Sequence, residues 1–315
     1  MKKCNYAKIN LSLHVTNKNK PKDFHDLDMI NFTINLKDSV SIKFIENNDN
    51  FINISCNNPL VPTDKTNIVY KVVEKFKKTY KLSFSCNISI NKKIPLEAGL
   101  AGGTGNAVAV LKILNQKFKT NMNELQQMKF MEDIASDGPY MVVSCFARVK
   151  GKGEKVSPFK CNLKHKVVVI KPKKGCSTKE VFSTLDYKNL VHPNINKIEQ
   201  GLKDNDFKMI ASHVDNSLNA SALKHNEEIL DVINRLKTSG FEIVSMSGSG
   251  STVFAISNRK LPYKTYKKII NPNNYDLVGE YRIKNWSRVW MDMFWNFLRK
   301  HIYKPWQILV LCRVF

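Results

Sequence analysis

The sequence predicts a protein of two domains that combine helices and strands. Its 315 residues are enough for two domains of roughly 150 residues each. A strand pattern, a glycine-rich loop and a helix pattern follow one another over residues 83–118, and a second set of elements begins near residue 160. A second glycine-rich turn leads into an apolar strand near residue 250. Two such turns, each beside regular structure, favour a ligand site more strongly than one alone.

The first glycine-rich loop, Ile94–Ala107, has four glycines within seven residues. Ser83–Ile90 before it alternates like a half-buried strand, and apolar residues from Ala107 to Phe118 recur at helical spacing. Glycines let the backbone approach a ligand, and a helix start offers N–H groups to phosphate. The Thr104 hydroxyl is a candidate ligand for phosphate or magnesium. The loop matches neither the Walker A nor the dinucleotide pattern, so by itself it predicts either a phosphate site or a simple turn.

Alternating residues predict strands near the N-terminus. In Tyr6–Val15 the pattern places Lys8 and Asn10 together on the face opposite the core. That face either holds a phosphate and a hydroxyl or is solvated. Two further alternating stretches, 30–36 and 40–44, predict two more strands.

An aromatic residue and a histidine, Phe24 and His25, follow a polar loop. The pair either stacks on and hydrogen-bonds a base or anchors the loop. Further along, Thr66 or Asp64 is the expected N-cap of a helix whose apolar stripe lies within 68–76.

The segment after the glycine-loop helix predicts a helix over Asn123–Ala135, which ends in Ser136–Tyr140. This short acidic turn before Gly-Pro is either a helix stop or a means of presenting the Asp137 carboxylate at the mouth of a site. Ala147–Glu154 then predicts a strand and a tight turn.

In the second half, Lys166–Ile170 predicts a buried strand, and Phe182 lies in the segment after it. Met246–Ile256 predicts the second glycine-rich turn and its strand. The helical patterns between them cover Ile195–Leu202, Phe207–Leu218 and Ile229–Leu236.

The C-terminal residues differ in composition from the rest. All four tryptophans lie between Trp286 and Trp306. We expect residues 284–315 to lie outside the fold. Their composition suggests translated sequence that was not selected as part of this fold, for instance after a frameshift. The alternative is a basic amphipathic helix that binds a membrane surface or a partner.

The net charge of +23 favours anionic partners such as nucleotides and phosphorylated metabolites. Because the basic residues are dispersed, specific nucleic-acid binding is not expected. The seven cysteines are odd in number and contain no C-x-x-C pair, which favours a reducing cytoplasm over a disulfide framework or zinc site. No run of 18 apolar residues occurs, so no membrane-spanning helix is expected.

Several ordered motifs together resemble the 4-diphosphocytidyl-2-C-methyl-D-erythritol kinases. These enzymes belong to the GHMP superfamily, with galactokinase, homoserine kinase, mevalonate kinase and phosphomevalonate kinase. The resemblance covers about residues 4–283. The residues that carry it are Ala7–Leu11, Phe24–Leu27, Ile94–Ala107, Ser136–Tyr140, Gly151–Glu154 and Met246–Ile256.

The resemblance implies a two-domain α+β fold. Residues 1–160 are expected to form an ATP-binding domain with a left-handed βαβ unit, an exception to the usual crossover hand. Residues 161–283 are expected to form a C-terminal α/β sandwich domain. The implied activity is ATP-dependent phosphorylation of the 2-hydroxyl of 4-diphosphocytidyl-2-C-methyl-D-erythritol, a step of the non-mevalonate isoprenoid pathway.

The resemblance also assigns roles to residues. Asp137 is expected to accept the hydroxyl proton, and Lys8 to neutralise charge beside it. The residues expected to bind ATP, with Mg²⁺, are Pro95, Leu96, Glu97, Ala98, Gly99, Leu100, Ala101, Gly102, Gly103, Thr104, Gly105, Asn67 and Lys92. The residues expected to bind substrate are Asn10, Phe24, His25, Phe182, Gly248, Ser249 and Gly250. No residue is assigned to the metal.

Three positions depart from the family pattern. Gly103-Thr104-Gly105 stands where the family usually has Gly-Ser-Ser, and Phe24 stands where Tyr is common. Gly138 follows the catalytic aspartate where Val is frequent, which we expect to loosen the turn that aims the carboxylate.

Other functions remain open from the sequence. One alternative is another kinase of the superfamily, which acts on mevalonate, homoserine or a sugar. A second is a catalytically degenerate member of the superfamily, and a third is a basic nucleic-acid-binding protein on a related fold. The expected partner is a small molecule, and the expected state is a monomer or a homodimer.

Overall fold

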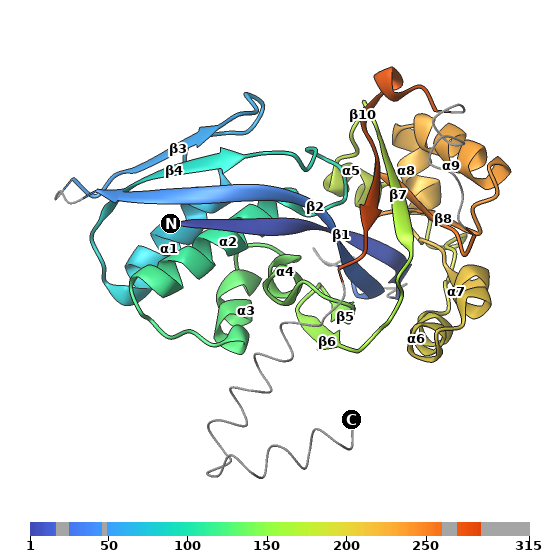
Figure 1. Cartoon of the computed structure of the whole chain (residues 1–315), viewed down its shortest axis with the longest axis horizontal. Coiled ribbons are helices and arrows are strands. Elements are labelled where there is room, and N and C mark those ends of the chain that lie inside the picture. Colours follow the sequence, from blue (N-terminus) through green and yellow to red (C-terminus); the bar gives the residue numbers. More distant parts are fainter. Residues whose placement is uncertain (17–24, 46–48, 260–269, 285–315) are drawn as a thin grey trace, which may run out of the picture. The chain divides into compact units, whose positions relative to one another are not determined.

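The computed structural model describes residues 1–16, 25–45, 49–259 and 270–284. Met1–Lys284 forms one compact unit (Figure 1). The predictions for Phe24 and for the tail beyond residue 284 lie outside the described residues.

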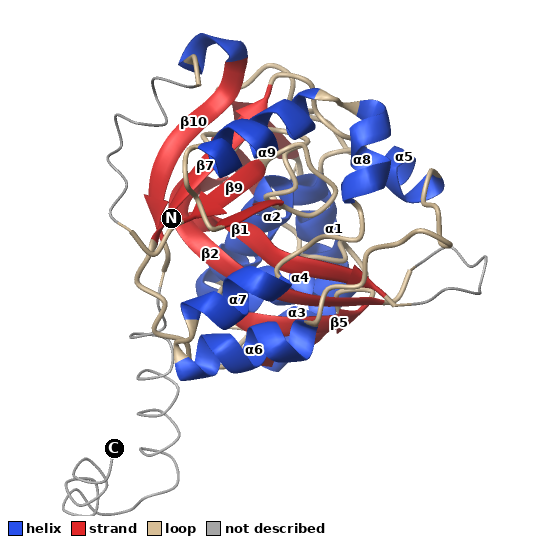
Figure 2. Ribbon diagram, turned by 90° about the vertical axis from the view of Figure 1, so that its right-hand side faces the viewer, coloured by secondary structure: helices blue, strands red, loops and turns tan. Residues whose placement is uncertain are grey.

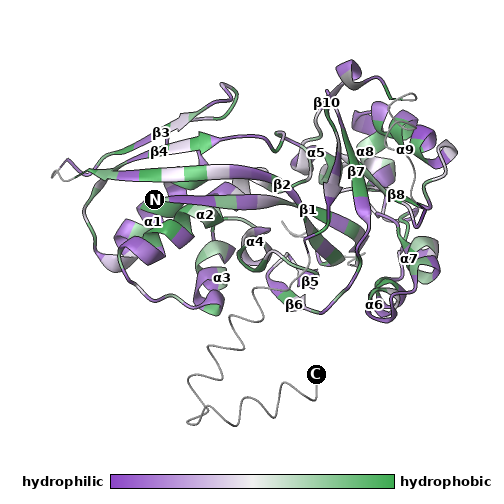
Figure 3. Cartoon of the chain, in the orientation of Figure 1, coloured by the Kyte–Doolittle hydropathy of each residue, from purple (hydrophilic) through white to green (hydrophobic). Residues whose placement is uncertain are grey.

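The larger sheet is built around a long central strand, β2, which pairs with β1, β4 and β5. The sequence predicts two strands here, 30–36 and 40–44, but the structure has one. The same alternate positions are buried in both stretches, and Asp38, which lies between them, is buried as well. The two stretches therefore continue as one strand with the same face toward the core. Figure 3 shows the alternation along β2. The strands of this sheet are β1 (Lys2–Val15), β2 (Leu27–Ile45), β3 (Ile52–Cys56), β4 (Ser85–Asn91), β5 (Ala147–Gly151) and β6 (Lys155–Pro158).

A βαβ unit is formed by β3, α1 (Ile68–Tyr80) and β4, since β3 and β4 pair in parallel. The hand of its crossover stays a prediction. The expected N-cap was wrong: the cap is Asn67, whose Oδ1 accepts a hydrogen bond from Val69 N at 2.8 Å. Asp64 instead accepts hydrogen bonds from Thr66 within the preceding turn.

Helix α2 (Gly102–Lys117) packs against β1 and β2, and α1 packs against α2. Helix α2 begins at Gly102, whereas the sequence predicts its start near Ala107. Part of the predicted glycine loop is therefore the first turn of this helix. A Cβ at Gly102 would lie 2.9 Å from the Lys92 ammonium, and one at Gly105 would lie 2.5 Å from Asn5 Nδ2. The glycines therefore let this helix lie close to the sheet.

The acidic turn of residues 136–140 joins two helices, α3 (Glu124–Glu132) and α4 (Gly138–Val143). The loosening expected from Gly138 stays a prediction. A Cβ at Gly138 would lie 2.8 Å from both the Cβ and the carbonyl oxygen of Met131. The missing side chain lets α4 pack tightly against the end of α3.

The smaller sheet has the order β10-β7-β9-β8, and all its neighbours are antiparallel. Figure 2 shows α6 beside α7, and α5 and α8 at the other end of this half. Its elements are β7 (Lys166–Pro172), α5 (Thr178–Ser183), α6 (Ile195–Asp204), α7 (Phe207–His213), α8 (Asn219–His225), α9 (Glu228–Thr238), β8 (Ile243–Met246), β9 (Val253–Ile256), η1 (Pro272–Asn274) and β10 (Tyr275–Arg282).

The single helix predicted over Phe207–Leu218 was wrong, because α7 ends at His213. The next residues run along β1: Leu13 N donates to Asp215 O at 3.2 Å, and Ser217 N donates to Leu13 O at 2.9 Å. These tertiary hydrogen bonds take the place of helical ones.

One hydrophobic core joins the two sheets. It includes Ile9 and Phe32 from the larger sheet, Val169 and Phe254 from the smaller one, and Ile198 of α6. The predicted boundary near residue 160 falls between β6 and β7. The exact domain limits stay a prediction.

Candidate active site

The glycine loop before α2 has an alternating backbone. Glu97, Gly99 and Ala101 have φ angles of +47°, +67° and +53°, and the residues between them do not have positive φ. Alternation of this kind points successive N–H groups into one concavity, which suits an anion. Helix α2 has no side-chain cap, so its first N–H groups face the same region. The loop therefore has the geometry of a phosphate site.

The second glycine-rich turn, residues 247–252 between β8 and β9, is docked on this loop. Ser247 Oγ accepts a hydrogen bond from Asn10 N and donates one to Gly99 O, both at 3.1 Å. A Cβ at Gly99 would lie 2.1 Å from Ser247 O. The two turns that are far apart in sequence thus form one unit, and Gly99 is the point of closest approach.

A residue that the sequence analysis missed, Asn216, holds the second turn in place. Its Nδ2 donates to Met246 O at 2.9 Å and to Gly248 O at 2.8 Å, and its Oδ1 accepts from Leu218 N. Asn216 is buried, so these bonds use the amide fully. Asn216 lies between α7 and α8, and no sequence pattern marks it. Its role becomes visible only from its tertiary hydrogen bonds.

A cavity of about 830 Å³ lies against both turns. It brings together most of the predicted site residues, namely Lys8, Asn10, His25, Pro95–Thr104, Asp137, Phe182, Gly248 and Ser249. Four described residues of the prediction do not line it: Asn67, Lys92, Gly105 and Gly250. Lining residues that the prediction missed include Leu13, Met29, Ser136, Lys152, Thr178 and Lys179.

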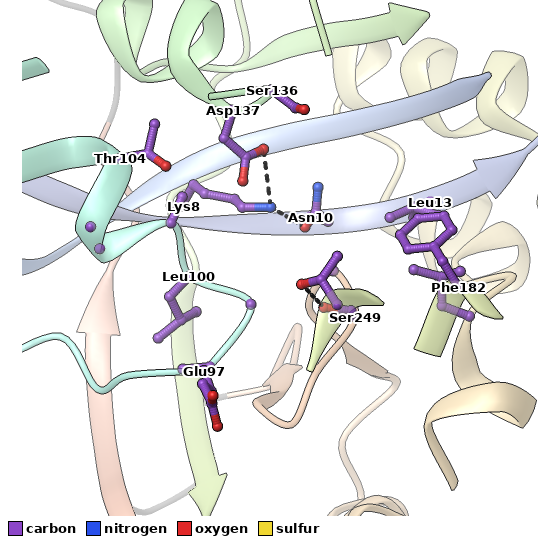
Figure 4. Close-up of a pocket in the computed structure, with 18 of the residues that line it drawn as sticks. Lys8, Asn10, Leu13, Glu97, Leu100, Thr104, Ser136, Asp137, Phe182 and Ser249 are labelled. Atoms are coloured by element: carbon purple, nitrogen blue, oxygen red, sulfur yellow. Dashed lines mark hydrogen bonds and ion pairs between the residues drawn. The ribbon is translucent and has the colours of Figure 1, made fainter. Parts of the chain in front are cut away.

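Lys8 and Asp137 lie together in the middle of the cavity (Figure 4). Lys8 Nζ lies 3.6 Å from Asp137 Oδ1 and donates to Asn10 Oδ1 at 2.5 Å. The interpretation of this face of β1 as solvated was wrong: Lys8 and Asn10 are 4% and 1% exposed. Asn10 Nδ2 in turn donates to Asn31 Oδ1 at 2.7 Å. This chain of contacts fixes the position of the ammonium group.

Asp137 is the N-cap residue of α4, yet its side chain makes no capping hydrogen bond. Its side chain is 35% exposed, against 5% for Lys8. The carboxylate is therefore open to the cavity. The next turn, β5–β6, packs beneath it, since a Cβ at Gly153 would lie 2.5 Å from Ser136 O. In Figure 4 the pair lies between Thr104 and Phe182.

At the Phe182 end, His25 contacts two aromatic rings. Its ring centroid is 4.7 Å from that of Phe182 and 5.9 Å from that of Tyr187, and Nε2 is hydrogen-bonded to the Tyr187 hydroxyl. Burial lowers the pKa of His25, so the neutral imidazole is favoured at neutral pH. Tyr187 was not predicted, because nothing in its local sequence sets it apart.

Asn67 and Lys92 serve the framework around the loop. Asn67 caps α1 with its Oδ1 and donates to Pro62 O. Lys92 Nζ forms a buried ion pair with Asp38 at 2.6 Å, in which both side chains are at most 4% exposed. Their roles in nucleotide binding stay a prediction.

We expect Gly99→Ala to disrupt the site. The new methyl group overlaps a backbone carbonyl and occupies a left-handed backbone conformation, which together cost about 1–3 kcal/mol or more. Urea denaturation should show the loss. Gly103→Ala is the matched control, because the nearest atom would be 3.9 Å away and alanine favours the helix. Equal unfolding free energies for the two variants would contradict the docking of the two turns.

The described residues contain no group of three His, Cys, Asp or Glu side chains placed to hold a metal ion. Among the same residues, no helix has both the length and the apolar character needed to cross a bilayer.

Comparison with known proteins assigns this site to a family. The family model for the GHMP kinases N terminal domain matches residues 67–145, and that for GHMP kinases C terminal matches residues 198–272. A 4-diphosphocytidyl-2-C-methyl-D-erythritol kinase of Clostridium botulinum (strain Eklund 17B / Type B) is 38% identical over 84% of this chain and 94% of that protein. The enzyme of the same name from Clostridium tetani (strain Massachusetts / E88) is 34% identical over 82% and 90%. This chain belongs to the 4-diphosphocytidyl-2-C-methyl-D-erythritol kinase family.

It is thus a small-molecule kinase of the GHMP type, as the sequence predicts. A crystal structure of 4-(cytidine 5'-diphospho)-2C-methyl-D-erythritol kinase matches the kinase with a TM-score of 0.74 at 20% identity, over 91% of this chain and 100% of the other. A homoserine kinase from Cytophaga hutchinsonii matches with a TM-score of 0.65 at 19% identity, over 89% and 95%. The predicted two-domain GHMP kinase fold is confirmed.

Proposed function

We propose that this kinase transfers the γ-phosphoryl group of ATP to the 2-hydroxyl of 4-diphosphocytidyl-2-C-methyl-D-erythritol. The observation that carries the proposal is the Lys8–Asp137 pair, which faces the same cavity as the glycine loop. The name of the relatives supplies the substrate.

The loop and the N-terminus of α2 fit the phosphates of ATP. Three alternating positive-φ residues and uncapped helix N–H groups form the concavity. Mg²⁺ that accompanies a nucleotide usually takes few protein ligands. Thr104, which lines the cavity, is the candidate protein ligand, and the ion would supply neutralisation of phosphate charge.

Asp137 accepts the proton of the attacking hydroxyl and orients its oxygen. That oxygen forms a bond to the γ-phosphorus as the bond to the leaving ADP oxygen breaks. Lys8, held by Asn10, stabilises negative charge on the transferring group. Positioning and charge stabilisation of this kind provide most of the catalysis in phosphoryl transfer.

The cytosine is expected at the other end of the cavity. Phe182 offers a ring for stacking, and His25 offers a hydrogen-bonding edge. Phe24 is proposed as the second stacking ring. Asn10, Gly248, Ser249 and Gly250 are proposed to contact the substrate near the reacting centre.

The proposal is tested by ADP release with ATP, Mg²⁺ and the cytidine diphosphate substrate. We expect turnover with this substrate, and none with mevalonate or homoserine, since these lack a base for the His25 end. Binding of the cytidine nucleotide without turnover would indicate a degenerate kinase. Turnover only with another alcohol would replace the proposed substrate.

We also propose that the kinase works in the cytoplasm, as a monomer or homodimer without a nucleic-acid partner. Each cysteine in the described residues is a free thiol, which fits a reducing compartment. Size-exclusion chromatography with light scattering would determine the oligomeric state.

A further inference from the structure

The contact between His25 and Tyr187 joins two distant parts of the chain at the base end of the cavity. His25 lies two residues before β2, and Tyr187 lies four residues after α5. The rings are nearly parallel, with an interplanar angle of 12°. The Tyr187 hydroxyl reaches His25 Nε2. A ring that only packed against the histidine would not need this hydrogen bond.

The chemistry of the two groups favours one direction for the bond. A phenol is a good donor, and burial raises the pKa of Tyr187, so its proton stays on the oxygen. The nitrogen of a neutral imidazole is a stronger acceptor than a phenol oxygen. Tyr187 therefore donates to Nε2, and a neutral imidazole then carries its single proton on Nδ1.

Because Nε2 is bonded to Tyr187, Nδ1 is the His25 nitrogen that can form a hydrogen bond with a ligand. No hydrogen bond to Nδ1 occurs within the described residues, and His25 lines the cavity. A donor at Nδ1 matches N3 of cytosine, which is an acceptor, and opposes N3 of uracil, which carries a hydrogen. Both bases present O2 as an acceptor, so N3 is the atom at which this donor can distinguish them.

We propose that Tyr187 is a specificity-determining positioning residue, which fixes the His25 tautomer that accepts cytosine and rejects uracil. This inference rests on the proposed cytidine substrate. Tyr187 acts through His25, since the cavity lining includes His25 but not Tyr187. Its hydroxyl, and not its ring, carries the function.

The test compares Tyr187→Phe with the wild-type kinase. Phenylalanine keeps the ring against His25 and removes only the hydroxyl. Tyr80→Phe is the matched control, because Tyr80 packs on Phe76 within α1 and does not line the cavity. Calorimetry would measure the affinities of cytidine diphosphate and uridine diphosphate for each protein.

We expect Tyr187→Phe to reduce the preference for cytidine over uridine diphosphate by about tenfold, the effect of one hydrogen bond. The ATP KM should not change. Nitrogen-15 NMR of His25 in the free protein should show the Nδ1–H form in the wild type and a mixture of tautomers in Tyr187→Phe. Tyr80→Phe should match the wild type in both measurements.

An unchanged nucleotide preference in Tyr187→Phe, or an Nε2–H tautomer in the wild type, would overturn this inference. Failure of the proposed function has a different signature. The wild type would then turn over no cytidine substrate and would bind both nucleotides equally, while NMR would still report whether Tyr187 fixes the tautomer.

Discussion

Asp137→Asn should lower kcat by about 10³-fold, within the range that general-base catalysis contributes. The amide keeps the size of the side chain but cannot accept the proton of the hydroxyl. It also removes the charge that lies 3.6 Å from Lys8 Nζ. Stopped or coupled assays of ADP release would measure the change.

The matched control is Asp133→Asn, four residues earlier. Asp133 pairs with Lys75 at the surface, and its side chain is 70% exposed. This substitution should leave kcat unchanged. Asp137 makes no capping hydrogen bond, its side chain is 35% exposed, and Lys8 keeps its hydrogen bond to Asn10. The variant should therefore remain folded under assay conditions, which urea denaturation would check. A kcat for Asp137→Asn close to the wild-type value would exclude this carboxylate as the base.

Lys92→Met should lower the free energy of unfolding by about 3–5 kcal/mol, as removal of one partner of a buried ion pair does. Asp38 is fully buried. It accepts hydrogen bonds from Lys92 Nζ, Lys93 N and Ile94 N at 2.6, 2.7 and 2.8 Å. The substitution leaves the Asp38 carboxylate without its lysine counter-ion. This carboxylate also holds the two residues after Lys92, where the glycine loop begins. Urea denaturation at pH 7 measures the effect.

Lys93→Met is the control, because the Lys93 side chain is exposed while its backbone N–H still bonds Asp38. It should have the stability of the wild type. The measurement also separates two roles for Lys92. Wild-type stability with a raised ATP KM in Lys92→Met would support direct nucleotide binding, as the family resemblance implies.

The altered glycine triplet changes the site less than its sequence suggests. Thr104 keeps a hydroxyl that lines the cavity. Gly105 faces Asn5 of β1, where a Cβ would lie 2.5 Å from Nδ2. A serine at position 105 would thus place its hydroxyl in the interface between α2 and β1. The cavity lining does not include this position.

The sequence by itself determined the local elements and the ordered motifs. Alternation predicted β1 and β4, and the glycine loop with Lys8 and Asp137 indicated a kinase of this family. These signals are local, because strand period, helix spacing and glycine content depend on near neighbours. Its predictions were wrong where tertiary contacts compete with local ones. Just beyond the end of α7, the carbonyl oxygen of Asp215 accepts a hydrogen bond from Leu13 N of β1. Helix α2 begins within the glycine run.

Only the tertiary structure decided how the site is assembled. Asn216 and Tyr187 have no distinguishing local pattern, yet one holds the second glycine turn and the other contacts His25. The burial of Lys8 likewise depends on elements far along the chain, since Asp137 reaches it from the start of α4. Hydrogen bonds and ion pairs between distant residues depend on the packing of both sheets around one core, which sequence periodicity does not encode.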